Sequence, residues 1–263
     1  MRAQARAAKR FAALLCIALA SAGAAREAQP PPDMRLVPGG RYTPFYPVKN
    51  EQPAEIAPFY LDVLPVSNAQ MLAFVRAEPA WRRSRVSPLM ADAAYLSHWA
   101  GDLELGADAP PDAPATFVSW FAADAWCRYE GKRLPTEAEW ELAAAPPIED
   151  AAARAENERR ILAFYARPRG PLPRVGSTPP NAYGLRDLHG VIWEWVEDFN
   201  ASFAAADARS DRERELENIC GGGAIGAADV SRYATFMRTA FRSSLQATYA
   251  LHHLGFRCAR DLP

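Results

Sequence analysis

The sequence predicts a single α+β domain that is built largely of loops, with short irregular strands and two or three helices. Its 263 residues are 49% hydrophobic, which is enough apolar material for one sizeable core or two small ones. The 23 prolines and 15 glycines favour turns over long helices. Neither an internal repeat nor a linker-like segment divides the chain. These observations indicate one continuous domain with little regular secondary structure.

The first part of the domain is expected to combine short strands with one helix. Residues 34–42 read as a strand, a Gly-Gly turn and a second short strand. A further strand, a turn and a helix are expected over 55–81, where Ser67 can cap the helix and apolar residues follow at helical spacing. Residues 79–115 contain repeated prolines and are expected to be irregular.

Two helices are expected on either side of the tripeptide "RLP". Ser119 can cap the first of them, which is predicted to run to about Glu130 and to end at Gly131. Thr136 can cap the second, where its spacing from Glu139 fits a capping box. The helix starts are therefore the best-defined features of this region.

The last part of the chain contains a helix, irregular strands and a glycine loop. Residues 149–166 predict a polar surface helix, and residues 180–199 alternate turn residues with apolar strand residues. The glycines at 221–223 are followed by a predicted helical turn, and residues 254–260 read as a final strand.

The N-terminus has the features of a secretory signal peptide. A basic segment precedes the apolar run Phe11–Ala20, and Ala22-Gly23-Ala24 fits a cleavage site. The apolar run is too short to span a bilayer. We therefore expect a signal peptide over 1–24, a flexible tether over 25–33 and the folded domain over 34–263. The expected location is periplasmic or secreted, with no membrane span in the mature protein.

Removal of the signal peptide would change the cysteine count. Cys127, Cys220 and Cys258 remain, and an oxidising compartment permits disulfides. An odd count implies one bridge and one remaining thiol, but the spacing alone does not say which pair forms. The net charge of −1 gives no sign of nucleic-acid binding or of attraction to an anionic membrane.

The common catalytic and metal-binding motifs are absent from the sequence. There is no H-x-x-x-H, C-x-x-C, P-loop or G-x-S-x-G pattern. His252 and His253 are adjacent, so in a strand they would face opposite sides. A histidine-based metal site is therefore not expected.

Three segments resemble a known family. The sequences "GKRLPTEAEWELAAA" (131–145), "NAYGLRDLHGVIWEW" (181–195) and "LGFRCAR" (254–260) occur in the order found in the formylglycine-generating enzyme, or sulfatase-modifying-factor, family. The resemblance covers about 34–260. It implies a loop-rich variant of the C-type-lectin fold, and it implies a disulfide between Cys127 and Cys258. Cys220 would then be the odd thiol, more simply a small buried residue than a reactive one.

The chain departs from the family pattern at both of the family's metal sites. Catalytic members bind copper through two cysteines after the glycine loop, whereas the matching positions here fall on Ala227, Asp229, Arg232 and Ala234. Copper-dependent formylglycine synthesis is therefore not expected. The family's calcium-binding asparagine corresponds to Val191, which has no side-chain oxygen. Glu194 is left as a residual calcium ligand, which keeps calcium open as a cofactor.

The resemblance implies a periplasmic accessory or maturation factor that binds a client protein or peptide. Among the family's exported branches, the one that accompanies copper nitrite reductase is the most similar. The client is expected in a groove beside the glycine loop, where two arginines four residues apart share a helix face. The alternative is that both arginines pair with internal carboxylates. The groove residues are Gly221, Gly222, Gly223, Arg238, Arg242, Ser243 and Ser244.

Two other functions remain open. One is an oxidoreductase with altered chemistry on a phenolic or peptidic substrate, similar to the pyoverdine-maturing branch of the family. Its candidate catalytic residues are Cys220, Asp229, Arg238, Arg242, Glu194 and His252. The other is a lectin-like module that binds a ligand, although the missing calcium asparagine argues against calcium-bridged sugar binding.

Overall fold

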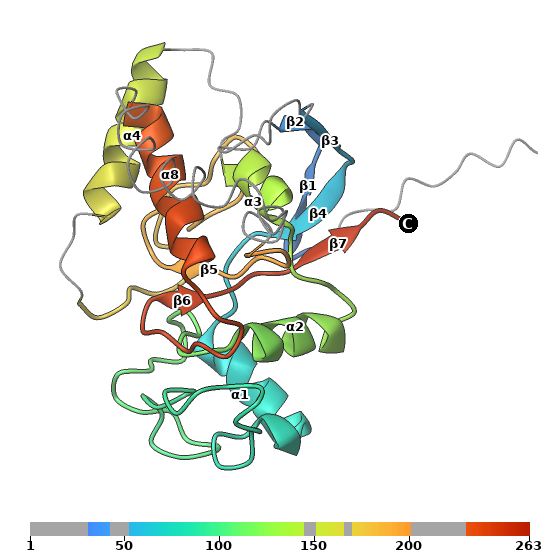
Figure 1. Cartoon of the computed structure of the whole chain (residues 1–263), viewed down its shortest axis with the longest axis vertical. Helices are drawn as coiled ribbons and strands as arrows, with labels where there is room; N and C mark the ends of the chain where they lie inside the picture. The colour runs from blue at the N-terminus through green and yellow to red at the C-terminus, as the bar shows by residue number, and fades with distance from the viewer. Residues whose placement is uncertain (1–30, 43–52, 145–150, 166–169, 201–229) are drawn as a thin grey trace, which may run out of the picture.

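The computed structural model describes residues 31–42, 53–144, 151–165, 170–200 and 230–263. Figure 1 shows small sheets and separate helices joined by long loops, as expected for an α+β chain with little regular secondary structure. The predicted signal peptide, most of the tether and the glycine loop lie outside the described residues. In the part of the chain that is described, no helix has both the length and the apolar run needed to cross a bilayer.

The largest sheet joins the two ends of the domain. Its central strand, β4 (Phe59–Asp62), is buried along its whole length and pairs on either side with β1 (Met34–Val37) and β7 (Ala259–Asp261). All of these pairings are antiparallel. Residues more than 200 positions apart in sequence therefore complete one sheet.

The remaining strands form two small pairs. β2 (Gly40–Tyr42) pairs with β3 (Ala54–Ile56), and β5 (Trp193–Glu194) runs parallel to β6 (Leu254–Gly255). The strands expected over 34–42 are both present, but they belong to different sheets. The chain turns at Gly39, where φ is +75° and an added Cβ would lie 2.3 Å from the Ile56 carbonyl oxygen. This position therefore requires glycine.

The predicted helix starts are confirmed. α1 (Asn68–Ala77) begins with a capping box formed by Ser67 and Gln70, and the Ser119 side chain caps α2 (Trp120–Tyr129). At α3 (Glu137–Ala144), the Glu139 amide donates to the Thr136 hydroxyl, and the Glu139 carboxylate accepts the Thr136 amide. A short 3₁₀ turn, η1 (Pro79–Trp81), follows α1.

The last two helices lie side by side. α4 (Ala151–Tyr165) is the predicted polar helix, and it packs against α8 (Val230–Ser243), as Figure 1 shows. The helical turn expected after the glycine loop is in fact part of a helix of 14 residues. The final strand expected over 254–260 is divided into β6 and β7.

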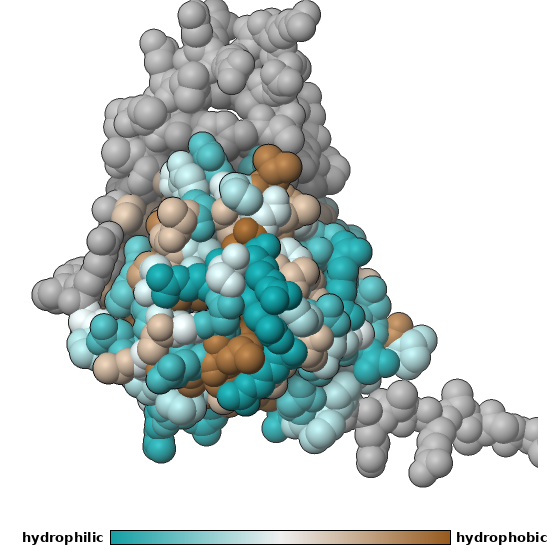
Figure 2. All heavy atoms as spheres, turned by 90° about the horizontal axis from the view of Figure 1, so that it is seen from below, coloured by the Kyte–Doolittle hydropathy of each residue, from teal (hydrophilic) through white to brown (hydrophobic). Residues whose placement is uncertain are grey.

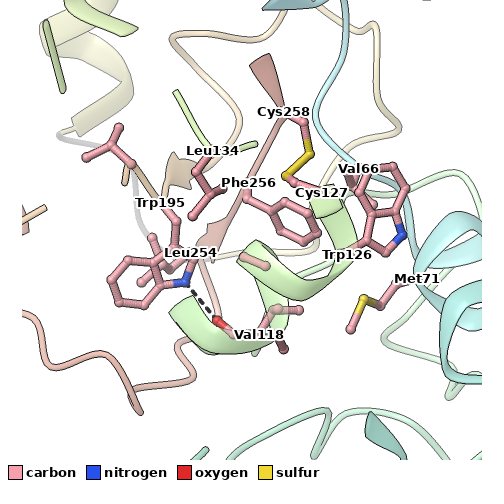
Figure 3. Close-up of a cluster of buried hydrophobic side chains, with 14 of the residues drawn as sticks. Val66, Met71, Val118, Trp126, Cys127, Leu134, Trp195, Leu254, Phe256 and Cys258 are labelled. Carbon is pink, nitrogen blue, oxygen red and sulfur yellow. Dashed lines mark hydrogen bonds between the residues drawn. A yellow bond between two sulfur atoms is a disulfide. The ribbon is translucent and has the colours of Figure 1, made fainter. Parts of the chain in front are cut away.

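Aromatic side chains fill the core where regular strands are scarce. Figure 3 shows the centre of this cluster, with Trp126 and Phe256 packed edge to face at 5.6 Å between ring centroids. Trp195 is fully buried, and its indole Nε1 donates to the Val118 carbonyl oxygen at 2.8 Å. A tryptophan with a satisfied N–H contributes a large buried area without leaving a polar atom unpaired.

The structure contains the Cys127–Cys258 disulfide that the resemblance implies. The bond links α2 to the segment between β6 and β7, with the two Cα atoms 5.6 Å apart and a sequence separation of 131. Both cysteines are fully buried in the core cluster of Figure 3. The covalent link therefore ties the middle of the chain, at α2, to the C-terminal segment that also completes the central sheet.

We expect reduction of the disulfide to destabilise the domain by about 2 to 4 kcal/mol, because a long closed loop restricts the unfolded chain. Urea denaturation with and without reductant measures this difference, with thiol labelling to confirm that the bond has opened. The urea unfolding midpoint of a Cys127→Ala/Cys258→Ala variant gives an independent measurement of the same effect. An unchanged unfolding midpoint in both experiments would contradict the stabilising role of the bond.

Candidate functional site

The three family-like segments meet at one buried ion pair. The Arg257 guanidinium donates to both carboxylate oxygens of Glu194, from Nε at 2.7 Å and from Nη2 at 2.8 Å. The indole Nε1 of Trp140 donates to the same carboxylate at 2.7 Å. Each of these residues comes from a different one of the three segments, so their side chains form the junction that holds the segments together.

Arg257 also satisfies the backbone of neighbouring loops. Its remaining N–H groups donate to the carbonyl oxygens of Asp62, Val63 and Arg186 at 2.8 to 3.1 Å. These contacts link the end of β4 and the loop before β5 to the C-terminal segment. The motif arginine therefore has a structural role, because it neutralises a buried carboxylate and satisfies buried carbonyls.

The expectation that Glu194 is a residual calcium ligand needs correction. Both of its oxygens are engaged by Arg257 and Trp140 inside the core, where the side chain is inaccessible to solvent. Val191, at the family's asparagine position, is buried and has no side-chain oxygen. Within the described ranges, no group of three or more His, Cys, Asp or Glu side chains is arranged to hold a metal ion.

A second set of buried charges joins α3 to α8. Arg238 pairs with Glu141 at 2.6 Å, and Arg242 pairs with Glu141 at 2.7 Å and with Glu137 at 3.1 Å. All four side chains are buried. The Arg242 guanidinium also lies 4.7 Å from the ring centroid of Trp140, in cation–π geometry. We call these four charged residues the α3–α8 network.

The α3–α8 network balances two positive charges against two negative ones. Burial alone would raise the pKa of Glu141, but the charges and hydrogen bonds of Arg238 and Arg242 outweigh it and lower that pKa to about 2. Burial raises the pKa of Glu137, because only Arg242 among these arginines contacts its carboxylate. The network is therefore a set of matched internal charges.

The structure favours the alternative in which both arginines pair internally. Arg238 and Arg242, expected to line a client groove, point into the domain toward α3. Ser243 is half-buried, and Ser244 is exposed with its hydroxyl donating to the Phe241 carbonyl oxygen. The other expected groove or catalytic residues lie outside the described residues; they are Cys220, Gly221, Gly222, Gly223 and Asp229.

His252, a candidate catalytic residue, belongs to a group of half-buried aromatic rings. The Phe117 ring contacts two histidines, His252 at 5.6 Å and His98 at 4.8 Å between ring centroids. In a second group, the Phe241 ring stacks on Trp193 at 4.4 Å and lies 5.7 Å from His253. We call these two groups of three rings the aromatic row. It combines planar apolar faces for stacking with imidazoles that can transfer a proton.

Sequence reasoning missed most of the aromatic row. Its rings come from five separate places in the sequence, and no periodicity connects them. Phe117 also adopts a left-handed backbone conformation, with φ of +54°. This conformation is uncommon for phenylalanine and could not be predicted from the residue type. Burial, reinforced by the charge of His252, lowers the pKa of His98 to about 4, so this imidazole is neutral at physiological pH.

Burial of His189 is expected to make the stability of the domain depend on pH. Its ring lies edge-on to Trp140 at 5.5 Å, and burial together with the Arg238 charge lowers its pKa to about 3. An unfolded histidine binds a proton near pH 6.5, so acidification protonates the unfolded state first. The stability contributed by the neutral ring is therefore complete above pH 6.5 and declines toward pH 3.

Replacing His189 with glutamine should make the acid-induced loss of stability shallower by up to about 1.4 kcal/mol per pH unit. Urea unfolding at several values between pH 6.5 and 5 tests this, above the range in which most carboxylates titrate. Identical slopes for the wild type and His189→Gln would show that this histidine does not contribute to the pH dependence.

The fold and the junction of motif residues define a sulfatase-modifying-factor domain. The model of the family described as "Sulfatase-modifying factor enzyme 1-like domain" matches residues 20–262, and the chain belongs to this family. The Streptomyces coelicolor formylglycine-generating enzyme is 29% identical, over 93% of this chain and 97% of that protein. The inactive C-alpha-formylglycine-generating enzyme 2 of Mus musculus is 28% identical, over 87% of this chain and 85% of that protein.

Among solved structures, PvdO from Pseudomonas aeruginosa matches with a TM-score of 0.47 and 20% identity, covering 87% of this chain and 94% of that one. This likeness is too weak to carry a conclusion about function. The family assignment depends instead on the family match and on relatives of nearly equal length.

Proposed function

We propose that this protein is an exported accessory or maturation factor that binds a client protein and does not perform copper-dependent formylglycine synthesis. The observation that supports the exclusion of copper-dependent synthesis is the Cys127–Cys258 disulfide. It occupies two of the four cysteines and leaves only Cys16 and Cys220. Cys16 lies in the expected signal peptide, so the mature chain would have a single thiol where a two-thiolate copper site needs two.

The family relationship supports a role of this kind. The relatives include a formylglycine-generating enzyme and a mouse protein named as inactive, so the scaffold occurs with and without that activity. The internal pairing of Arg238 and Arg242 takes both guanidiniums out of the expected client groove, so the proposed client would be bound by other residues. The copper nitrite reductase branch remains the proposed type.

The absence of formylglycine synthesis is tested with a cysteine-containing peptide derived from a sulfatase. The purified protein is loaded with Cu(I) under air, and mass spectrometry follows conversion of the cysteine to the aldehyde. The Streptomyces coelicolor relative is the positive control. We expect no aldehyde above background, and turnover at the rate of the control would overturn this part of the proposal.

The client role is tested by deleting the gene from its native genome and measuring nitrite reductase activity and copper content in the periplasm. Activity should fall and return when the gene is restored. An unchanged, fully copper-loaded nitrite reductase would refute the proposed type. Export is tested separately by fusing residues 1–33 to a reporter that is active only outside the cytoplasm.

The aromatic row supports a second proposed function, oxidation of a phenolic or peptidic substrate with dioxygen as the electron acceptor. Phe117 and His252 place an apolar ring edge beside a half-exposed imidazole, an arrangement that could position a phenol and accept its proton. A screen of phenols and tyrosine peptides for oxygen consumption tests this alternative. Activity that is lost in His252→Ala and retained in Cys220→Ala would favour it over the accessory role.

A further inference from the structure

The backbone is strained at two positions that meet in space, Leu96 and Phe117. Their φ angles are +47° and +54°, left-handed values that large side chains rarely adopt. The Leu96 amide donates to the Phe117 carbonyl oxygen at 2.9 Å, and the Phe117 amide donates to the Leu251 carbonyl oxygen at 2.9 Å. Three segments that are far apart in sequence are therefore joined at one strained contact. We call these three residues the Phe117 hinge.

The His98 imidazole packs on the Phe117 hinge without a hydrogen bond. Its ring centroid lies 4.8 Å from that of Phe117, and both of its nitrogens are buried. Neither nitrogen has a hydrogen-bond partner among the residues that the structure describes. The backbone of His98 is also tightly packed, because a Cβ added at Gly106 would lie 2.1 Å from the His98 carbonyl oxygen. A neutral imidazole tolerates such a site, whereas a protonated one would be dehydrated without gaining a partner.

The surrounding charges do not compensate for a proton on His98. Burial is the main reason why the pKa of His98 is lowered to about 4, and the charges of His252 and Arg83 lower it further, against the opposing charge of Asp108. A histidine that is released to solvent binds a proton near pH 6.5. Acidification therefore favours any state in which this imidazole is released, increasingly so from pH 6.5 down to about pH 4.

The segment that carries His98 lies at one end of the molecule. This irregular segment, between η1 and α2, forms loops beside α1 at the lower end of Figure 1, away from the sheet of β1, β4 and β7. Figure 2 shows the same end from below, where hydrophilic side chains predominate on the surface. A peripheral segment of this kind can open locally without separating the strands of the central sheet.

We propose that the Phe117 hinge opens in acid: a proton taken up from solvent by His98 releases the segment around Leu96 from Phe117 and uncovers the Phe117 ring. Release also relieves the backbone strain at Leu96 and Phe117, so the hinge opens more readily than the whole domain unfolds. Because the Phe117 ring also contacts His252, opening changes access to one group of the aromatic row. The hinge would regulate that access whichever client or substrate the protein binds.

Hydrogen–deuterium exchange of the exported, processed protein, followed by NMR between pH 6.5 and 4.5, measures the opening. The amides of Leu96 and Phe117 report on the hinge, and the Asp62 amide, which donates to the Cys258 carbonyl oxygen, reports on the central sheet. After correction for the intrinsic effect of pH on exchange, the two hinge amides should exchange at least about tenfold faster at pH 4.5 than at pH 6.5. The Asp62 amide should exchange more slowly than both at every pH.

Two variants remove the proton-binding site from the hinge. His98→Phe keeps an aromatic ring against Phe117, and His98→Gln replaces the ring with a neutral amide; in both, the acid-induced acceleration at the hinge amides should disappear. The matched control is His189→Gln, which removes a different buried imidazole and should leave that acceleration unchanged. Hinge amides that exchange no faster in acid, that keep the acceleration in the His98 variants, or that exchange only together with the Asp62 amide would each overturn the proposal.

Discussion

Replacing Arg257 with methionine is expected to leave most of the protein unfolded. The substitution leaves the Glu194 carboxylate buried without its cation and removes the donors to three backbone carbonyls. Breaking a buried ion pair costs about 3 to 5 kcal/mol, and each lost hydrogen bond adds about 1 kcal/mol. The sum is comparable with the whole stability of a typical domain, about 5 to 15 kcal/mol.

Circular dichroism and urea unfolding of the purified protein measure this effect, with solubility on expression as a first reading. Arg260→Met is the matched control, because Arg260 is exposed on the same C-terminal segment, and it should change stability by less than about 0.5 kcal/mol. A double variant, Arg257→Met/Glu194→Gln, should recover part of the loss by removing the unpaired charge. A folded Arg257→Met with wild-type stability would contradict the assigned role.

The second large effect is expected from Glu141→Gln in the α3–α8 network. Glu141 is the carboxylate that both arginines share, so its loss leaves Arg238 without a carboxylate partner in the network and Arg242 with Glu137 alone. Uncompensated buried charge should cost about 3 to 5 kcal/mol. The low pKa of Glu141, about 2, means that this shared carboxylate stays charged until strongly acidic pH.

Urea unfolding measures this loss, and a Glu141→Gln/Arg238→Met double variant determines how much of it is interaction between the two charges. The control is Glu156→Gln on α4, where the salt bridge to Arg159 is exposed. That change should alter stability by less than about 0.5 kcal/mol. If Glu141→Gln were as mild as the control, α3 and α8 would be held together by something other than these charges.

Features encoded within a few residues could be predicted from the sequence. The helix starts at Ser67, Ser119 and Thr136 follow from local hydrogen bonds between neighbouring side chains and amides, which need no tertiary context. The loop-rich α+β character could also be predicted, because the proline and glycine content favours turns whatever the tertiary contacts are. The Cys127–Cys258 pairing is different, because the spacing left it open and only the family resemblance implied it.

Features that depend on distant partners could not be predicted. The spacing of Arg238 and Arg242 shows that they share a helix face, but the direction of that face depends on Glu137 and Glu141, about 100 residues earlier. Glu194 is a second residue whose partner could not be predicted from the sequence. As a lone carboxylate in a motif it suggests a cation ligand, whereas its actual cation is the Arg257 side chain. Charge alone does not distinguish an internal partner from an external one.

The order of the strands in the central sheet has a consequence for the synthesis of the protein. One edge of β4 stays unpaired until β7, formed by the last residues of the chain, has been made. Cys127 likewise cannot form its disulfide until Cys258 has been synthesised. Because the ribosome releases the N-terminal end first, the emerging polypeptide cannot close its core early. The central sheet and the disulfide can therefore form only after residues 258–261 have been synthesised.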